Sequence, residues 1–194
     1  MTTQLPSYSR QSGFTLVELL IVAIILAILA AIVVPQFASS TDDAIDSALK
    51  SNLSGIRGAI DLYAQQHGGD FPGSTDSTTA GCPGGTGGDA AHIAGTLEGL
   101  TNQLTRYTNA AGESCSIADD PAGGLVEFPF GPYVKADTFP DNPVKKTNTV
   151  TFVTSGNLAM VGADTTAWRY DTKSGKFIAD DTSKDGKGVA YDTY

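Results

Sequence analysis

The fold of this chain is decided by residues 13–34, which read GFTLVELLIVAIILAILAAIVV. The run Leu19–Val34 is entirely apolar, and extending it back to Phe14 adds two polar residues, Thr15 and Glu18. About 20 apolar residues in a helix cross the hydrocarbon core of a bilayer. A buried core helix is the soluble alternative, but a helix apolar on every side is hard to bury in a chain of 194 residues. We therefore expect a membrane-spanning helix.

The rest of the chain is polar, acidic and rich in glycine. The whole chain contains 12 Lys and Arg against 21 Asp and Glu, a net charge of −9, and 22 glycines. The basic excess that binding to a phosphate backbone requires is missing, so we do not expect general nucleic-acid binding. Two cysteines are too few for a disulfide-dense scaffold or a four-cysteine zinc site. The near-zero mean hydropathy of −0.05 averages two unlike parts.

Glu18 is the one charged residue inside the apolar stretch. A carboxylate is unfavourable in hydrocarbon, so an ionisable residue there is by default a candidate functional residue. It needs a cationic partner, and the span contains no Lys or Arg. A free amino terminus at Phe14 of a neighbouring subunit would provide that partner.

Residues Gly13 to Val22 closely resemble the class III signal of type IV pilins and type II secretion pseudopilins. In that family, prepilin peptidase cuts after the glycine and N-methylates the new terminal Phe, and the glutamate four residues later pairs with the terminal amine of a neighbour. The resemblance implies cleavage between Gly13 and Phe14, N-methylation of Phe14, and an assembly role for Glu18. Pro35 stands where family members carry a helix-bending proline.

The same resemblance divides the chain into segments and assigns each one to a side of the membrane. Residues 1–13 would be a cleaved leader, residues 14–35 a transmembrane and filament-core helix, and residues 36–194 a periplasmic head. Arg10, the one charged side chain of the leader, favours a cytoplasmic N-terminus. Because cleavage precedes the apolar run, the mature chain keeps its anchor, which an ordinary signal peptide loses. We expect a single-pass protein of the bacterial inner membrane that assembles into a periplasmic or cell-surface filament.

The head is expected to begin with an amphipathic helix over residues 36–67. Its apolar residues recur at spacings of three or four: Ile45, Leu49, Leu53, Ile56, Ile60 and Tyr63. His67 and the two glycines after it form a stop signal, and we expect His67 to end the helix rather than bind a ligand. A helix over residues 14–67 would be about 80 Å long. The hydrocarbon core is only about 30 Å thick, so the second half of the helix must lie outside it.

A loop and a second helix are expected over residues 68–122, followed by a β-rich region over residues 123–194. The second helix follows from apolar spacing over residues 93–107, with Asp89 as a candidate cap. In the β-rich part, residues 148–153 favour a strand, and two short apolar segments flank a hairpin signal that ends at Gly175.

These elements together predict the α+β class. The expected architecture is a pilin-like fold in which a long N-terminal helix, half membrane-spanning and half amphipathic, packs on a small antiparallel β-sheet head. Residues 130–143 resemble, more loosely, the Gly-Pro-Tyr and Asp-Pro region of major pseudopilins. The chain departs from that pattern at residues 144–146, where Val-Lys-Lys replaces an aromatic-glycine pair.

Export to an oxidising space would allow Cys82 and Cys115 to form a disulfide. The closed loop would then stabilise the head by roughly 3–4 kcal/mol. Two free thiols are the alternative.

A calcium site is a second candidate feature of the head, although no cofactor is expected to be required. Asp181, Ser183 and Asp185 alternate before a glycine, and Asp192 follows, which resembles a calcium loop. Major pseudopilins often bind calcium in C-terminal loops, so the resemblance favours a structural Ca²⁺. However, an aspartate replaces the usual bidentate glutamate, and no helical pattern flanks the loop. A solvated acidic loop is the alternative.

The family resemblance implies a structural subunit of a type II secretion-like filament that drives protein export. Its expected partners are copies of itself, minor pseudopilins, the inner-membrane assembly platform, prepilin peptidase and the membrane. A type IV pilus major pilin, acting in adhesion, motility or DNA uptake, shares the same N-terminus and is the alternative. We expect no enzyme, because the sequence shows no Ser-His-Asp arrangement, metalloprotease helix or phosphate loop, and two histidines offer little acid–base machinery.

Overall fold

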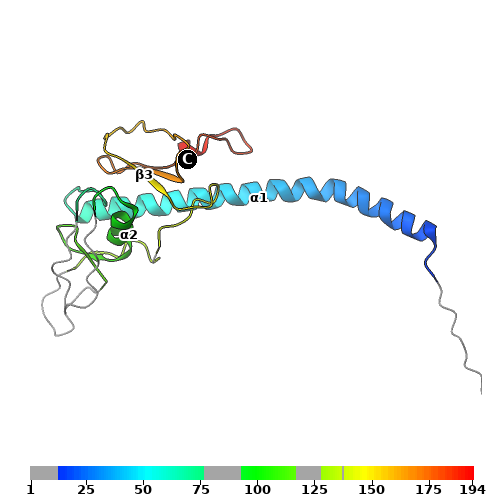
Figure 1. Ribbon diagram of the computed structural model, residues 1–194, viewed down its shortest axis with the longest axis horizontal. Helices are drawn as coiled ribbons and strands as arrows, with labels where there is room; N and C mark the ends of the chain where they lie inside the picture. Colours follow the sequence, from blue (N-terminus) through cyan, green and yellow to red (C-terminus); the bar gives the residue numbers. More distant parts are fainter. Residues whose placement is uncertain (1–12, 77–92, 117–127, 137) are drawn as a thin grey trace, which may run out of the picture. The chain divides into compact units, whose positions relative to one another are not determined.

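A computed structural model describes residues 13–76, 93–116, 128–136 and 138–194. The chain divides into two compact units between Thr41 and Asp42. A single helix, α1 (Leu16–Gln66), supplies residues to both units. Figure 1 shows this helix without a break.

In the first unit, α1 contains the predicted membrane-spanning segment. Leu16–Val34 is long and apolar enough to cross a membrane, judged by length and composition, and none of it is buried. The long apolar N-terminal helix is therefore confirmed. α1 continues through residue 35, and the bend assigned to Pro35 stays a prediction.

In the second unit, α1 buries the predicted apolar stripe. Its five main members are at most 3% exposed: Leu49, Leu53, Ile56, Ile60 and Tyr63. The helix ends at Gln66, one residue before the end predicted at His67. Gly68 adopts a left-handed φ of 69°, and the N–H of Gly69 donates to the carbonyl of Ala64 at 2.8 Å. This arrangement closes the helix with a glycine C-cap and satisfies a terminal carbonyl.

The larger sheet has the order β3-β4-β5, formed by β3 (Val150–Val153), β4 (Trp168–Asp171) and β5 (Phe177–Ala179). β4 and β5 pair antiparallel, which confirms the predicted hairpin. β3, however, runs parallel to β4, with Val150 opposite Trp168, so the sheet is not wholly antiparallel as expected. The chain has room to cross back between them over residues 154–167, and parallel strands need such a long connection.

The segment between α1 and this sheet differs from expectation in two places. The second helix, α2 (Leu97–Thr105), begins four residues later than the apolar spacing suggested, because the Thr96 hydroxyl accepts the N–H of Gly99 at 3.2 Å and caps it there. Asp89, the predicted cap, lies outside the described residues. A small antiparallel pair then follows, β1 (Tyr107–Thr108) with β2 (Ser114–Cys115), where only helix and loop were expected. Strands of two residues are too short to show an alternating pattern.

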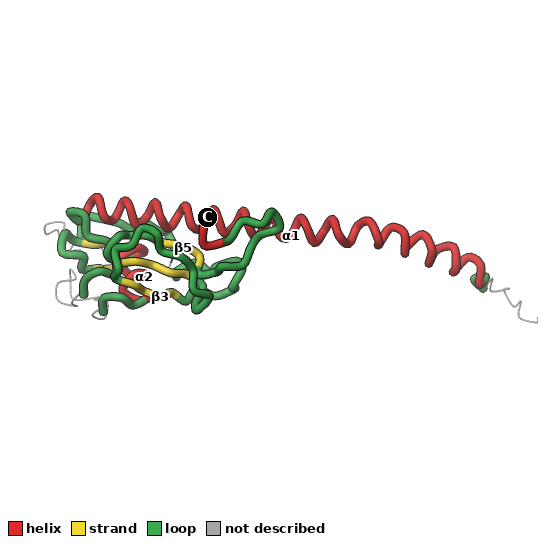
Figure 2. The backbone as a smooth tube through the Cα atoms, turned by 90° about the horizontal axis from the view of Figure 1, so that it is seen from above, coloured by secondary structure: helices red, strands yellow, loops and turns green. Residues whose placement is uncertain are grey.

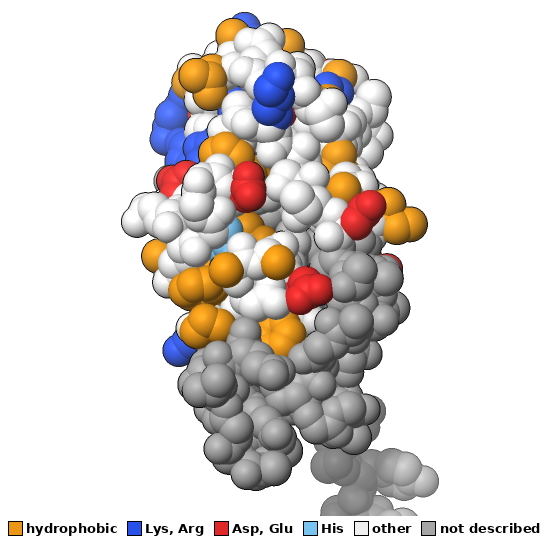
Figure 3. Space-filling model, turned by 90° about the vertical axis from the view of Figure 1, so that its left-hand side faces the viewer, with side chains coloured by type: hydrophobic (Ala, Val, Ile, Leu, Met, Phe, Trp, Pro, Cys, Tyr) orange, Lys and Arg blue, Asp and Glu red, His pale blue; other side chains and the backbone are white. Residues whose placement is uncertain are grey.

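The core lies between α1, α2 and the β3-β4-β5 sheet, which runs beside the second half of α1 in Figure 2. Its large members are fully buried side chains: Leu53, Ile60, Leu100, Leu104, Trp168, Tyr170 and Phe177. The chain ends in a short 3₁₀ helix, η2 (Tyr191–Thr193). On the face drawn in Figure 3, charged side chains of both signs lie among scattered apolar ones. The α+β class with a pilin-like layout is thereby confirmed.

Candidate processing and assembly site

The predicted processing site lies just before α1. Gly13, Phe14 and Thr15 precede the first helical residue, and Phe14 is 80% exposed. A Cβ added at Gly13 would meet no heavy atom within 4 Å. The peptide bond between Gly13 and Phe14 is therefore not covered by other described residues.

Thr15 and Glu18 form a reciprocal cap at the start of α1. The Thr15 N–H donates to Glu18 Oε2 at 2.8 Å, and the Glu18 N–H donates to Thr15 Oγ1 at 3.3 Å. The Thr15 hydroxyl also donates to Glu18 Oε2, at 2.7 Å. A Thr at the N-cap with a Glu three residues later is a capping box, which satisfies helix N–H groups that otherwise have no partner.

The capping box gives Glu18 a local role beside its predicted role in assembly. The two bonds that the carboxylate accepts from Thr15 both end on Oε2, so Oε1 takes no part in the box. The box was detectable in the sequence, because Thr-x-x-Glu before an apolar run is its signature. On the sequence alone, we assign Glu18 only a partner from another subunit, and the capping box adds a partner within the chain.

The helix that follows presents an apolar surface on all sides. Every large apolar side chain from Leu16 to Val34 is at least 40% exposed. An exposed apolar surface this continuous is not stable in water and marks a membrane or protein contact. Glu18 lies in the first turn of this surface.

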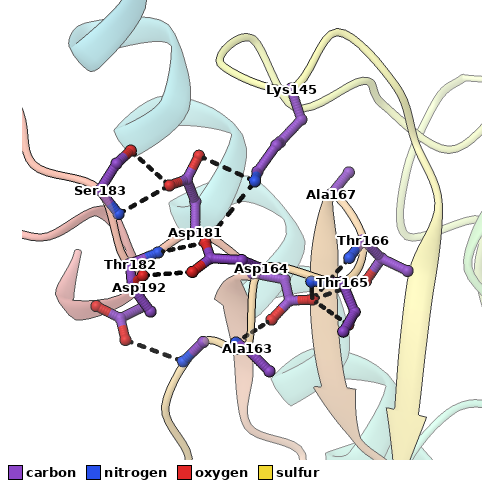
Figure 4. A network of polar contacts seen from close by, with 12 residues as sticks. Lys145, Ala163, Asp164, Thr165, Thr166, Ala167, Asp181, Thr182, Ser183 and Asp192 are labelled. Atoms are coloured by element: carbon purple, nitrogen blue, oxygen red, sulfur yellow. Dashed lines mark hydrogen bonds and ion pairs between the residues drawn. The ribbon is translucent and has the colours of Figure 1, made fainter.

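The predicted calcium ligands lie in the C-terminal loop, and Figure 4 shows the contacts of three of them, Asp181, Ser183 and Asp192. Asp181 Oδ1 accepts the N–H and the hydroxyl of Ser183, at 2.9 and 2.5 Å. The other oxygen, Oδ2, lies 3.6 Å from Lys145 Nζ. Both oxygens of Asp181 are thus already contacted by donors of the protein.

Asp185 and Asp192 are held in the same way by separate partners. Asp185 Oδ1 accepts the N–H groups of Lys187 and Val189, both at 2.8 Å, and Oδ2 accepts the hydroxyl of Tyr194. Asp192 Oδ2 accepts the N–H of Gly162 at 2.9 Å. Among the described residues, no three His, Cys, Asp or Glu side chains are grouped to hold a metal ion. The calcium site stays a prediction, and the geometry gives these residues a loop-bracing role.

Asp180 is a buried carboxylate that our sequence reading did not single out. Its Oδ1 accepts the N–H of Ala163 at 2.6 Å and lies 3.1 Å from Arg169 Nε, while Oδ2 accepts the N–H groups of Thr165 and Thr166. Burial raises its pKa, but these hydrogen bonds outweigh burial and leave the pKa well below its usual value. The ionised carboxylate therefore fixes the turn over residues 163–166. No local sequence signal distinguishes it from the aspartates beside it.

The two cysteines are only partly described. Cys115 is buried in β2 and is not a free thiol. Cys82 lies outside the described residues, so its pairing with Cys115 stays a prediction.

An exposed apolar helix with a capped glutamate in its first turn, followed by a small α+β head, gives the chain a pilin-like layout whose N-terminal helix is long and apolar enough to span a membrane. In agreement, residues 8–34 match the family described as the prokaryotic N-terminal methylation motif. Over 54 residues the chain is 48% identical to the "Type II secretion system core protein G" of Pseudomonas aeruginosa, strain PAO1. Both findings support the family of type IV pilins and pseudopilins.

The similarity is confined to part of each protein. The aligned segment covers 28% of this chain and 38% of the Pseudomonas protein. No solved structure matches the chain significantly. The comparisons therefore support a pilin-like filament subunit, and they do not separate secretion pseudopilins from type IV pilins.

Proposed function

We propose that this chain is a structural subunit that prepilin peptidase processes between Gly13 and Phe14, and that then polymerises into the filament of a type II secretion-like system. The observation that carries the proposal is the exposed apolar surface of Leu16–Val34 with Glu18 in its first turn. A surface of this kind has to be covered by lipid before assembly and by other helices after it.

The geometry supports a simple assembly step. Cleavage after Gly13 creates an amine at Phe14, one residue before the capping box. In the apolar surroundings of packed helices, the attraction between that ammonium and a carboxylate is much stronger than in water. Glu18 Oε1, which takes no part in the capping box, is the atom we assign to the amine of a neighbouring subunit.

The secretion assignment rests on the similarity to a type II secretion system core protein. Under this assignment the partners are copies of the chain itself, minor pseudopilins, the inner-membrane assembly platform and prepilin peptidase. The head would lie in the periplasm and the leader in the cytoplasm. The role is structural rather than enzymatic.

Substitution of Glu18 tests the assembly step. We expect Glu18→Ala to reach the membrane in wild-type amounts but to form few filaments, because the carboxylate for the neighbouring amine is missing. Glu98→Ala is the matched control, since Glu98 is also an exposed glutamate in the first turn of a helix. Immunoblots of membranes and of sedimented filaments measure both quantities. Wild-type filament yield from Glu18→Ala would refute the assembly role.

Deletion of the chain in its own bacterium tests the secretion assignment separately. The proposal predicts that exported proteins accumulate inside the cell envelope while surface filaments remain. Loss of surface filaments with normal export would instead identify the chain as a type IV pilin.

A further inference from the structure

His67 is a buried histidine at the point where the C-terminal end of α1 meets the rest of the head. It is 5% exposed. Its ring stacks on Tyr63 with centroids 3.7 Å apart and planes 6° from parallel. Phe130 and Tyr133 approach edge-on, with centroids 5.2 and 6.3 Å away. The imidazole is thus surrounded by aromatic rings from two segments far apart in the sequence.

The hydrogen bonding of the ring defines which nitrogen carries the hydrogen when the ring is neutral. His67 Nδ1 lies 2.8 Å from the carbonyl oxygen of Tyr63, and a carbonyl can only accept, so Nδ1 carries the hydrogen. In the neutral ring Nε2 is then a bare acceptor. Nε2 is buried and makes no hydrogen bond of ordinary geometry with the described residues, although the backbone of Asn109 lies close enough to favour the charged ring. A neutral ring tolerates this arrangement far better than a charged one, because an unpaired buried charge is costly.

Hydrogen bonds connect the two residues that approach the ring edge-on to neighbouring elements. Phe130 exchanges two backbone hydrogen bonds with Thr108 in β1, at 2.9 and 3.1 Å. Tyr133 donates its N–H to the carbonyl of Leu104 at 2.9 Å and its hydroxyl to Gln66 Oε1 at 2.7 Å. A change at His67 therefore acts on the joint between α1, α2 and residues 130–133.

We propose that His67 is a proton-sensitive latch, in which protonation at Nε2 loosens the contact of residues 130–133 with the end of α1. The ligand of this site is the proton itself. The latch does not depend on filament assembly, since every residue that forms it belongs to the second unit.

The groups around the His67 ring favour its neutral form. Burial lowers the pKa of His67. Three smaller influences raise it, namely the backbone of Tyr63, the backbone of Asn109 and the charge of Asp70, and the effect of burial is the larger. Burial raises the pKa of both Tyr63 and Tyr133, so both remain uncharged at neutral and acidic pH. The end of a helix and a stacked aromatic face each favour a cation. The lowered pKa shows that these attractions do not offset the loss of water around the ring.

The sign of the pH dependence follows from linkage. The folded pKa of His67 is lowered, so between that pKa and the ordinary value of about 6.5 the unfolded chain binds more protons than the folded one. The contribution of His67 to stability is fully present above about pH 6.5 and is lost as the pH falls below it.

Thermal unfolding of the full chain in detergent micelles, between pH 7.5 and 5.5, tests the latch. We expect the Tm of the wild type to fall across this range, and that of His67→Phe, which keeps an aromatic ring without a titrating nitrogen, to fall much less. His92→Gln removes the other histidine of the chain and should behave as the wild type. An equal fall of Tm in wild type and His67→Phe would overturn the proposal.

A second measurement on the wild type does not require any variant to fold. Titration of the His67 ring resonances by NMR should give a pKa below 6.5, and the N–H of Tyr133 should lose protection from hydrogen exchange, relative to that of Trp168, as His67 becomes charged. A pKa above 6.5, or equal protection of both amides throughout, would overturn the proposal.

Discussion

Single residues in this protein serve local structure before they serve function. A carboxylate is unfavourable in a helix that spans a membrane, and the capping box with Thr15 gives Glu18 two hydrogen-bond donors within its own chain. Because the box uses only Oε2, the same carboxylate is available to a partner as well. The sequence indicates both roles of Glu18. The Thr-x-x-Glu pattern predicts the capping box, and the charge within an apolar run predicts a partner from another subunit.

Asp180 carries the clearest stability prediction at the residue scale. Its side chain is fully buried, and Asp180→Asn removes the charge beside Arg169 and replaces one acceptor oxygen by an NH2 group that faces N–H donors. We expect Asp180→Asn to lower the free energy of unfolding by about 2–4 kcal/mol at pH 7. Asp141→Asn, at an exposed aspartate, should change it by less than about 0.5 kcal/mol. Urea unfolding of the two variants measures the difference, and equal stabilities would contradict the bracing role.

The pH dependence of the same variant provides a second check. The pKa of Asp180 is lowered in the folded state, so its contribution is present above the unfolded value of about 3.9 and is lost as the pH falls below it. The difference between wild type and Asp180→Asn should therefore shrink between pH 5 and pH 2. A constant difference would show that the carboxylate does not act through its charge.

At the scale of elements, periodic segments were predictable and short ones were not. The stripe from Leu49 to Tyr63 and the β4–β5 hairpin follow from spacing and from a glycine turn, and both are present. β1 and β2 contain two residues each and carry no readable pattern. The parallel pairing of β3 with β4 could not be predicted, because the sequence of a strand does not indicate which strand it pairs with or in which direction.

The β4–β5 hairpin depends on Gly175. Gly175 has a φ of +71°, and a Cβ there would enter the ring of Phe71. We expect Gly175→Ala to destabilise the head by about 1–3 kcal/mol, from backbone strain and the clash. Gly186→Ala is the control, because its φ is not left-handed and a Cβ there meets nothing within 4 Å. Equal Tm values for the two variants would refute this reading of the turn.

The C-terminal loop allows a test of the calcium prediction. The carboxylates of Asp181, Asp185 and Asp192 accept donors from the protein, and the calcium prediction requires the ion to compete with these donors. If the prediction holds, millimolar calcium raises the Tm of the full chain. Magnesium at equal ionic strength controls for screening. The rise should be specific to calcium and absent in Asp181→Asn, and an unchanged Tm would contradict the metal site.

At the scale of the whole molecule, the chain combines a lipid-compatible helix with an acidic head. The N-terminal segment could be assigned from the sequence because its constraints are local: a glycine, a charge at a fixed distance and an unbroken apolar run. The joint around His67 could not, because the rings that enclose it come from residues 63, 130 and 133. Contacts of that kind exist only after folding.

Mass spectrometry of the N-terminal peptide from assembled filaments tests the central claim most directly. We expect the mature chain to begin at Phe14, to carry one methyl group on its amine and to retain the complete run from Leu16 to Val34. An N-terminus upstream of Gly13, or one within the apolar run, would contradict both the processing site and the assembly step built on it.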